Sequence, residues 1–120
     1  MIDERTGVAV LRSCFERQGL SIREGVPLSL APELPHRTIH LDGYDEAARV
    51  GFEYLTTEAG DREEVTAEVI AELEARMERG ELYVLLIDER EVTSTALLER
   101  AAEHFLAVLR ARGRLPEVGS

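Results

Sequence analysis

Three side chains of the types used in metal-dependent hydrolysis occur close together in the middle of the chain. Asp42 and Glu53 are eleven residues apart, and His40 precedes Asp42 by two residues. Carboxylates are good ligands for Mg²⁺, and a bound divalent ion lowers the pKa of a coordinated water and stabilises charge on a phosphoryl group. His40 would act as an extra ligand or as a proton carrier. The sequence therefore places a candidate metal site at Asp42 and Glu53.

The two acids are expected on neighbouring strands of an antiparallel hairpin. Apolar side chains alternate with other side chains over residues 37–44 and again over residues 49–55, which is typical of strands that bury one face. The connection over residues 43–48 is short enough for a hairpin. Asp42 and Glu53 both fall opposite the apolar side of their strand. We therefore expect both carboxylates on one solvent-facing side, within reach of one cation.

Helices are predicted on either side of this hairpin. Apolar residues recur at helical spacing over residues 6–18, where Thr6 would cap the first helix. Asp61 and Glu64 resemble a capping box in front of the apolar stripe of a second helix. The last helix is expected to begin after the candidate caps at residues 93–94.

Two further strands are expected outside the hairpin. Residues 20–30 are predicted to be extended, and Pro27 confines that part to an edge or a bulge. Residues 83–87, Tyr-Val-Leu-Leu-Ile, predict a strand covered on both faces, central in the sheet and parallel to a neighbour. The expected fold is α/β with a small mixed sheet, in the order α-β-β-β-α-β-α. We expect one domain over residues 1–114 and a frayed tail over 115–120.

The composition argues against several functional classes. The chain has 120 residues, with 14 basic residues that are all Arg, 24 acidic residues and a net charge of -10. This charge disfavours nucleic acid and anionic membranes as unaided partners, because phosphate neutralisation requires a basic patch. No apolar run approaches the roughly 18 residues of a transmembrane helix, and the N terminus lacks the pattern of a secretory signal. With a single cysteine, these features predict a cytoplasmic protein without an intrachain disulfide.

That cysteine, Cys14, falls beside the apolar stripe of the first predicted helix. A free cysteine in such a place packs as a small buried hydrophobe, and this is the expected role. The alternative is a reactive thiol, which requires a basic neighbour, and Arg12 and Arg17 are the nearest candidates.

The stretch His40-Leu41-Asp42-Gly43-Tyr44, followed by Gly51-Phe52-Glu53-Tyr54-Leu55, resembles the core motif of the PD-(D/E)XK nuclease-like superfamily. The resemblance covers roughly residues 6–90, where that family's core is also helix, three strands, helix and strand. It implies a restriction-endonuclease-like fold in which Asp42 and Glu53 bind Mg²⁺ or Mn²⁺. The resemblance also implies a lysine two residues after the glutamate that positions and activates water. Some members add an acid from the first helix, and Glu16 lies at a comparable place.

Leu55 occupies the position of that lysine, and the chain has no Lys elsewhere. Arg49 or Arg62 could supply a positive charge, but an arginine keeps its proton and is a poor general base. The sequence therefore favours a non-catalytic, degenerate member of the superfamily. Such a protein would be a small acidic interaction or accessory subunit that binds a protein partner and needs no cofactor.

The alternative is a divalent-metal-dependent phosphodiesterase or nuclease with an atypical active site. Asp42 and Glu53 would hold the ion, and His40 or an arginine would replace the lysine. Under this alternative, a lysine restored at Leu55 should create or raise cleavage. A homodimer is compatible with either function, through the edge strand near Pro27 or through the Leu/Ala-rich last helix.

Overall fold

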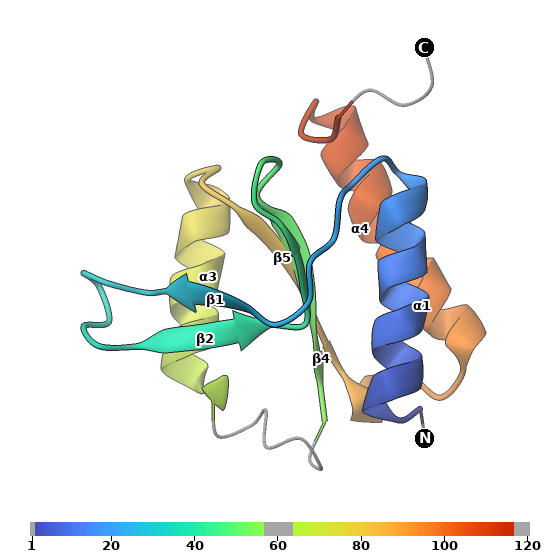
Figure 1. Ribbon diagram of the computed structural model, residues 1–120, viewed down its shortest axis with the longest axis horizontal. Coiled ribbons are helices and arrows are strands. Elements are labelled where there is room, and N and C mark those ends of the chain that lie inside the picture. Colours follow the sequence, from blue (N-terminus) through green and yellow to red (C-terminus); the bar gives the residue numbers. More distant parts are fainter. Residues whose placement is uncertain (1, 57–63, 117–120) are drawn as a thin grey trace.

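The computed structural model describes residues 2–56 and 64–116 (Figure 1). The helical elements are α1 (Glu4–Arg17), α3 (Ala67–Glu78), the short 3-10 helix η1 (Glu89–Glu91) and α4 (Thr95–Ala111). The strands are β1 (Val26–Ser29), β2 (Thr38–Leu41), β3 (Gly43–Asp45), β4 (Val50–Leu55) and β5 (Tyr83–Asp88). The described residues form a small mixed α/β fold, as the sequence predicts.

The strands form two sheets, whereas the sequence pattern predicts one. β3, β4 and β5 make a mixed sheet in that order, with β3 antiparallel and β5 parallel to β4. β1 and β2 form a separate antiparallel pair. The prediction of a single strand over residues 37–44 is wrong, because the chain bends at Asp42 and its two halves join different sheets. Alternation of apolar residues continues through the bend, so the pattern alone does not reveal it.

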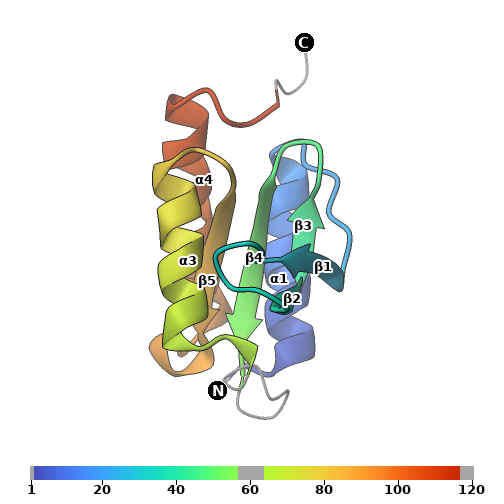
Figure 2. The same cartoon turned by 90° about the vertical axis from the view of Figure 1, so that its left-hand side faces the viewer.

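Helices and the β1–β2 pair cover the two faces of the three-stranded sheet (Figures 1 and 2). On one face, Phe52 and Tyr54 of β4 pack into a core with residues of α1 and α4. On the other face, Leu55 packs with residues of α3 and of the β1–β2 pair. Every residue of β4 is buried, so this strand occupies the centre of the molecule.

β5 lies at the edge of its sheet, and the prediction of a central strand is wrong in this respect. The predicted parallel pairing is confirmed, because β5 runs parallel to β4 over six residue pairs. The side chains of β5 belong to both core clusters, Tyr83 and Ile87 to one and Val84 to the other. A continuous apolar run therefore reports two covered faces, and it does not report how many strand neighbours there are.

The structure shows which residue caps the start of each long helix. Asp3, and not Thr6, caps α1, since the Asp3 carboxylate accepts a hydrogen bond from the Thr6 N–H at 2.8 Å. Thr66 caps α3, while Asp61 of the expected capping box lies outside the described residues. The expected cap of the last helix is confirmed at Ser94.

The stretch over residues 20–30 is a strand only in its second half, at β1. Leu20 and Ile22 are buried in the connection that precedes β1. Pro27 lies in β1, which pairs only with β2 among the described residues, so its expected edge position is confirmed. No helix in the described ranges is long and apolar enough to cross a membrane.

Candidate functional site

Asp42 and Glu53 are brought side by side where the β3–β4 ladder ends. The last registered pair of this ladder is Gly43 with Phe52, so Asp42 and Glu53 are the next residues along each strand. The backbone N–H of Asp42 donates a hydrogen bond to Oε1 of Glu53 at 3.1 Å. The N–H of Tyr54 donates to Oδ2 of Asp42 at 2.8 Å. The expected proximity of the two acids is therefore present in the structure.

The expected solvent-facing position of this pair is wrong for Glu53, which is only 1% exposed. Period two places Glu53 on the same side of β4 as Leu55, and that side is covered by α3 and the β1–β2 pair. Asp42 is half-buried at the bend between β2 and β3. A carboxylate this deeply buried requires hydrogen-bond donors, and a backbone amide supplies one to Glu53.

His40 has a carboxylate partner other than Asp42 or Glu53. The Nδ1 atom of His40 lies 3.5 Å from Oε1 of Glu64, and 61% of the His40 side chain is exposed. The backbone N–H of His40 also donates to the Glu64 carboxylate. These contacts hold the segment before α3 against β2, so His40 has a structural role at the surface.

Leu55, where the resemblance predicts a lysine, lies in an apolar core. Leu55 is 8% exposed and belongs to a cluster with Val69 and Leu73 of α3. Arg49, one of the two proposed substitutes, lies in the turn before β4, at the other end of that strand from Glu53. Arg62, the other, lies outside the described residues.

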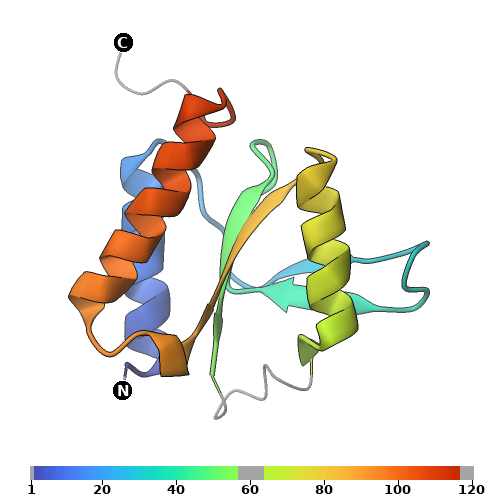
Figure 3. The same cartoon turned by 180° about the vertical axis from the view of Figure 1, so that it is seen from behind.

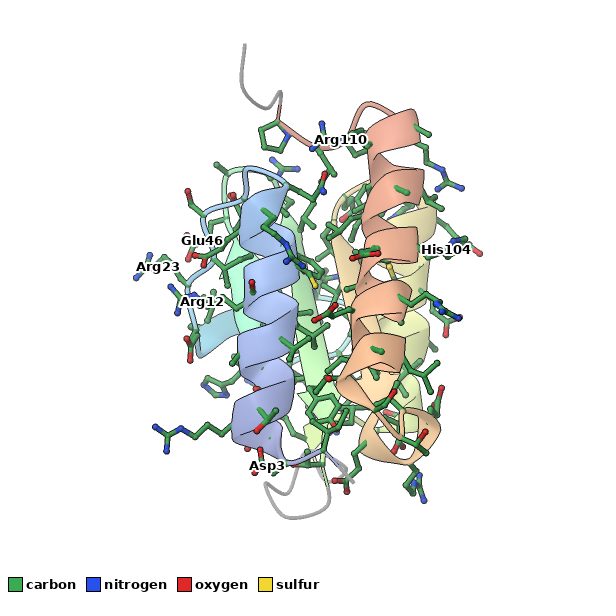
Figure 4. All side chains as sticks on the ribbon, turned by 90° about the vertical axis from the view of Figure 1, so that its right-hand side faces the viewer. Asp3, Arg12, Arg23, Glu46, His104 and Arg110 are labelled. Atoms are coloured by element: carbon green, nitrogen blue, oxygen red, sulfur yellow. The ribbon has the colours of Figure 1, made fainter. Side chains whose placement is uncertain are left out.

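A cavity of about 820 Å³ lies between α1 and the start of β1, and Asp42 forms part of its wall. Arg12 points from α1 toward this side (Figure 4) and forms an ion pair with Glu16 at 3.3 Å and a second with Glu24. Glu16, the expected acid of the first helix, therefore shares a cavity with Asp42 and is paired with an arginine. Charges of both signs line this cavity, so it does not present the basic surface that a phosphate group requires.

The donor set around the two acids is small for a metal site. Within residues 2–56 and 64–116, no group of three or more His, Cys, Asp or Glu side chains is arranged to hold a metal ion. Mg²⁺ can be held by one or two carboxylates with water and substrate oxygens, so Asp42 and Glu53 alone would have to supply the protein ligands. To do so, both carboxylates would have to coordinate the ion while accepting main-chain hydrogen bonds.

Cys14 is buried, as expected, with 2% of its surface exposed. Burial raises the pKa of the Cys14 thiol, and the Arg17 guanidinium, whose Nη2 lies 3.3 Å from Sγ, opposes part of that shift. A raised pKa keeps the thiol protonated, which makes it a weak nucleophile. The structure therefore supports the packing role over the reactive one.

Two features were not singled out from the sequence, the exposed residues of the Leu/Ala-rich last helix and one buried arginine. Leu97 and Val108 of α4 are large apolar residues with 42% and 36% of their surface exposed. Both lie outside the buried row of α4, which consists of Leu98, Ala102, Leu106 and Leu109, and their helical spacing is the signal that could have revealed a second apolar stripe. Arg76 was also missed, because a buried arginine within a helix pattern resembles a solvent-facing one.

Comparisons of the chain with protein-family models, with curated proteins and with solved structures found no match.

Proposed function

We propose that this protein is a non-catalytic, degenerate relative of the PD-(D/E)XK nuclease-like superfamily that works as a small acidic interaction or accessory subunit. The observation that carries the proposal is the use of both candidate metal ligands as hydrogen-bond acceptors for the main chain. Glu53 accepts from the Asp42 N–H, and Asp42 accepts from the Tyr54 N–H. These bonds give each acid a role in the fold that needs no metal ion.

The surroundings of the pair support the same function. Glu53 is almost fully buried, so a substrate phosphate would have to pass α3 and the β1–β2 pair, which cover this face of the sheet, to reach it. Leu55 packs against apolar residues at the place where the superfamily uses a lysine to activate water. A site without that lysine lacks the residue that positions and activates the attacking water in the superfamily.

The expected partner is a protein with a basic surface. The chain carries a net charge of -10, and complementary charge speeds encounter and selects partners. The same charge repels the phosphates of nucleic acid, which would require a basic partner to mediate contact.

The proximity of Asp42 and Glu53 favours one alternative, a metal-dependent phosphodiesterase with an atypical site. In that case Mg²⁺ or Mn²⁺ would bind the two carboxylates at the end of the β3–β4 ladder. Ions that bind only the folded state raise its stability by RT ln(1 + [L]/Kd), so this alternative makes a measurable claim.

Thermal unfolding with increasing Mn²⁺ separates the two functions. The variants are Asp42→Asn and Glu53→Gln, which keep an oxygen acceptor for the main chain, and Glu99→Gln, which removes one exposed charge from α4. We expect the same Mn²⁺ response from all four proteins, reflecting diffuse attraction to an acidic chain. A midpoint shift seen in wild type and Glu99→Gln but lost in the other two would identify a carboxylate metal site and support the phosphodiesterase.

A further inference from the structure

In the part of the chain that the structure describes, the edge of β5 opposite β4 has unpaired main-chain groups. The N–H of Tyr83 donates to the carbonyl oxygen of Arg49 at 2.9 Å, which directs the main-chain groups of Tyr83 toward β4. In a parallel ladder alternate residues face the same neighbour, so the N–H and C=O groups of Val84 and Leu86 point away from β4. Across the described ranges no strand pairs with this side of β5. Such an edge is a template for another strand.

This edge lacks the features that prevent strand addition. Residues 83–87 contain no proline, charge or bulge, and the register with β4 is continuous. The carboxylate of Asp88 comes only at the end of the strand. β5 runs between α3 and α4, as Figure 3 shows from behind, and Leu85 and Leu86 remain half-buried on its two faces. The edge is therefore long, apolar and open.

The flanking helices extend the apolar surface of the edge. On α4, the second apolar stripe consists of Leu97, Ala101, Phe105 and Val108, whose spacing places them on one side of the helix. Leu97 and Val108 are exposed, and Ala101 and Phe105 are half-buried. A cavity of about 250 Å³ opens between this stripe and Met77 of α3. An exposed apolar strip beside an unpaired strand marks an interaction surface.

We propose that a second copy of this chain pairs antiparallel along the β5 edge. The three-stranded sheets of the two copies then form one continuous sheet. With the two-fold axis at Leu85, Val84 of one copy faces Leu86 of the other, and the outward main-chain groups of both residues find partners. Tyr83 faces Ile87, so every pair over residues 83–87 is apolar. This inference goes beyond the proposed function and does not depend on it.

The same axis makes the two α4 stripes complementary. It brings the two α4 helices together antiparallel on one face of the joined sheet. Leu97 of one copy then meets Val108 of the other, and Ala101 meets Phe105. The ring of Phe105 stacks on Phe15 of its own copy, with ring centroids 6.0 Å apart, and stays partly exposed. The small side chain of Ala101 leaves room for that exposed part.

Charge complementarity also favours a second copy as the occupant. Arg112 and Arg114 lie near the start of β5, with the Arg114 guanidinium 5.8 Å from the ring centroid of Tyr83. The acids Asp88, Glu89 and Glu91 lie at its end with one arginine, Arg90. Two acids also lie near its start, Glu78 and Glu81, and Glu81 forms an ion pair with Arg79. Antiparallel pairing places the basic end of each copy against the acidic end of the other. Salt at about 0.15 M screens the net repulsion of two acidic chains beyond roughly 8 Å.

The test is sedimentation velocity over a concentration series of the whole chain at about 0.15 M salt. We expect wild type to shift toward twice the monomer mass of 13.4 kDa. Val108→Glu places two charges in the interface and should raise the dimer dissociation constant by roughly 100-fold or more. Ala107→Glu adds the same charge in the same turn of α4 but outside the stripe, and it should dimerise as wild type does.

Leu86→Pro tests the strand pairing separately from the helix contact. Leu86 points its N–H away from β4, so proline there removes no bond of the sheet and should prevent dimerisation with an unchanged circular dichroism spectrum. Wild type that stays monomeric throughout the series would overturn the proposal. Dimerisation of Val108→Glu at the wild-type concentration would do so as well, because it would place the interface elsewhere.

Discussion

Glu53 accepts a hydrogen bond from the backbone N–H of Asp42 at 3.1 Å, directly beyond the last residue pair of the β3–β4 ladder. The Asp42 carboxylate in turn accepts from the N–H of Tyr54 at 2.8 Å. Two side chains thus do what main-chain carbonyl groups do elsewhere in the ladder. The arrangement ends the ladder at Asp42, where the chain passes from β2 into β3, while the amides of Asp42 and Tyr54 remain satisfied, as buried amides must.

If this role is correct, the acceptor oxygen of Asp42 should matter more than its charge. Asp42→Ala leaves the Tyr54 N–H without this acceptor and should lower the free energy of unfolding by about 1–3 kcal/mol. Asp42→Asn keeps an acceptor oxygen and should lose clearly less. Urea unfolding followed by circular dichroism measures both values, with Glu99→Ala as a control for the loss of one exposed acid. Equal losses in the alanine and asparagine variants would show that the charge is required.

The proximity of Asp42 and Glu53 was predictable, and their burial was not. A short connection between two alternating segments is enough to bring residues of the two strands together, as it does here. The cover over Glu53 comes from α3 and from the β1–β2 pair, whose docking depends on contacts distant in the sequence. Local periodicity carries no information on such contacts, so Glu53 was expected to face solvent.

The edge position of β5 was not predicted either, because it also depends on contacts distant in the sequence. Its apolar run correctly predicted cover on both faces and a parallel neighbour, and both are present. The number of neighbours depends on where β3 pairs, which the β5 sequence does not encode.

The start of α1 was misplaced by three residues because Asp3 and Thr6 are both good caps, and only the structure shows which one accepts the hydrogen bond.

Arg76 of α3 holds the loop that follows β1. Its guanidinium lies 2.7 Å from the Glu72 carboxylate and 3.2 Å from that of Glu33, and it donates to the carbonyl oxygens of Ser29 and Ala31 at 3.1 and 3.3 Å. Only 11% of its side chain is exposed. Removing one partner of a buried ion pair is costly, so Arg76→Met should lower the free energy of unfolding by about 3–5 kcal/mol.

Limited proteolysis gives a second readout for Arg76. Cleavage in the loop over residues 30–37 should become faster in Arg76→Met, because the main-chain contacts that fix the loop are lost. Arg79→Met is the matched control, since the Arg79 side chain is 46% exposed and solvent screens its ion pairs, so its loss should change stability little. If both variants unfold at the same urea concentration, the contacts of Arg76 do not hold the loop over residues 30–37.

Gly7 is where α1 approaches the ring of Tyr54. A Cβ atom at this position would lie 2.6 Å from two ring carbons, and Tyr54 is fully buried, with its hydroxyl bonded to the Ile2 carbonyl at 2.7 Å. Gly7→Ala gains about 1 kcal/mol of helix propensity but overpacks the core at a cost of about 1–3 kcal/mol. Because the ring is held at both ends, we expect a net loss of stability on thermal and urea unfolding. Ser13→Ala, at an exposed position of the same helix, should be neutral or slightly stabilising, and a gain in Gly7→Ala would contradict the close approach.

Cys14 should make stability depend on alkaline pH. Burial raises the pKa of the folded thiol, so the unfolded chain loses its proton first and deprotonation favours unfolding. The free energy of unfolding should therefore fall as pH rises through the ordinary thiol pKa, at about pH 8–10. Cys14→Ala should show a shallower fall over this range, measured with urea at each pH. Alkylation by iodoacetamide should be slow in the native protein and fast in urea, and rapid native alkylation would indicate a thiol activated by Arg17.

Leu55 gives the sharpest contrast between a vestigial site and a working one. Leu55 is 8% exposed within the cluster formed with α3, so Leu55→Lys would bury an ammonium group and should lower the free energy of unfolding by about 3 kcal/mol or more. Leu55→Met, which conserves volume, should lose less than about 1.5 kcal/mol. With Mn²⁺ and a phosphodiester substrate, both variants should stay at background, because the neighbouring carboxylates already bind main-chain amides. Cleavage by Leu55→Lys that disappears when Asp42→Asn is added would instead show that the two acids still hold a metal ion and that only the lysine was missing.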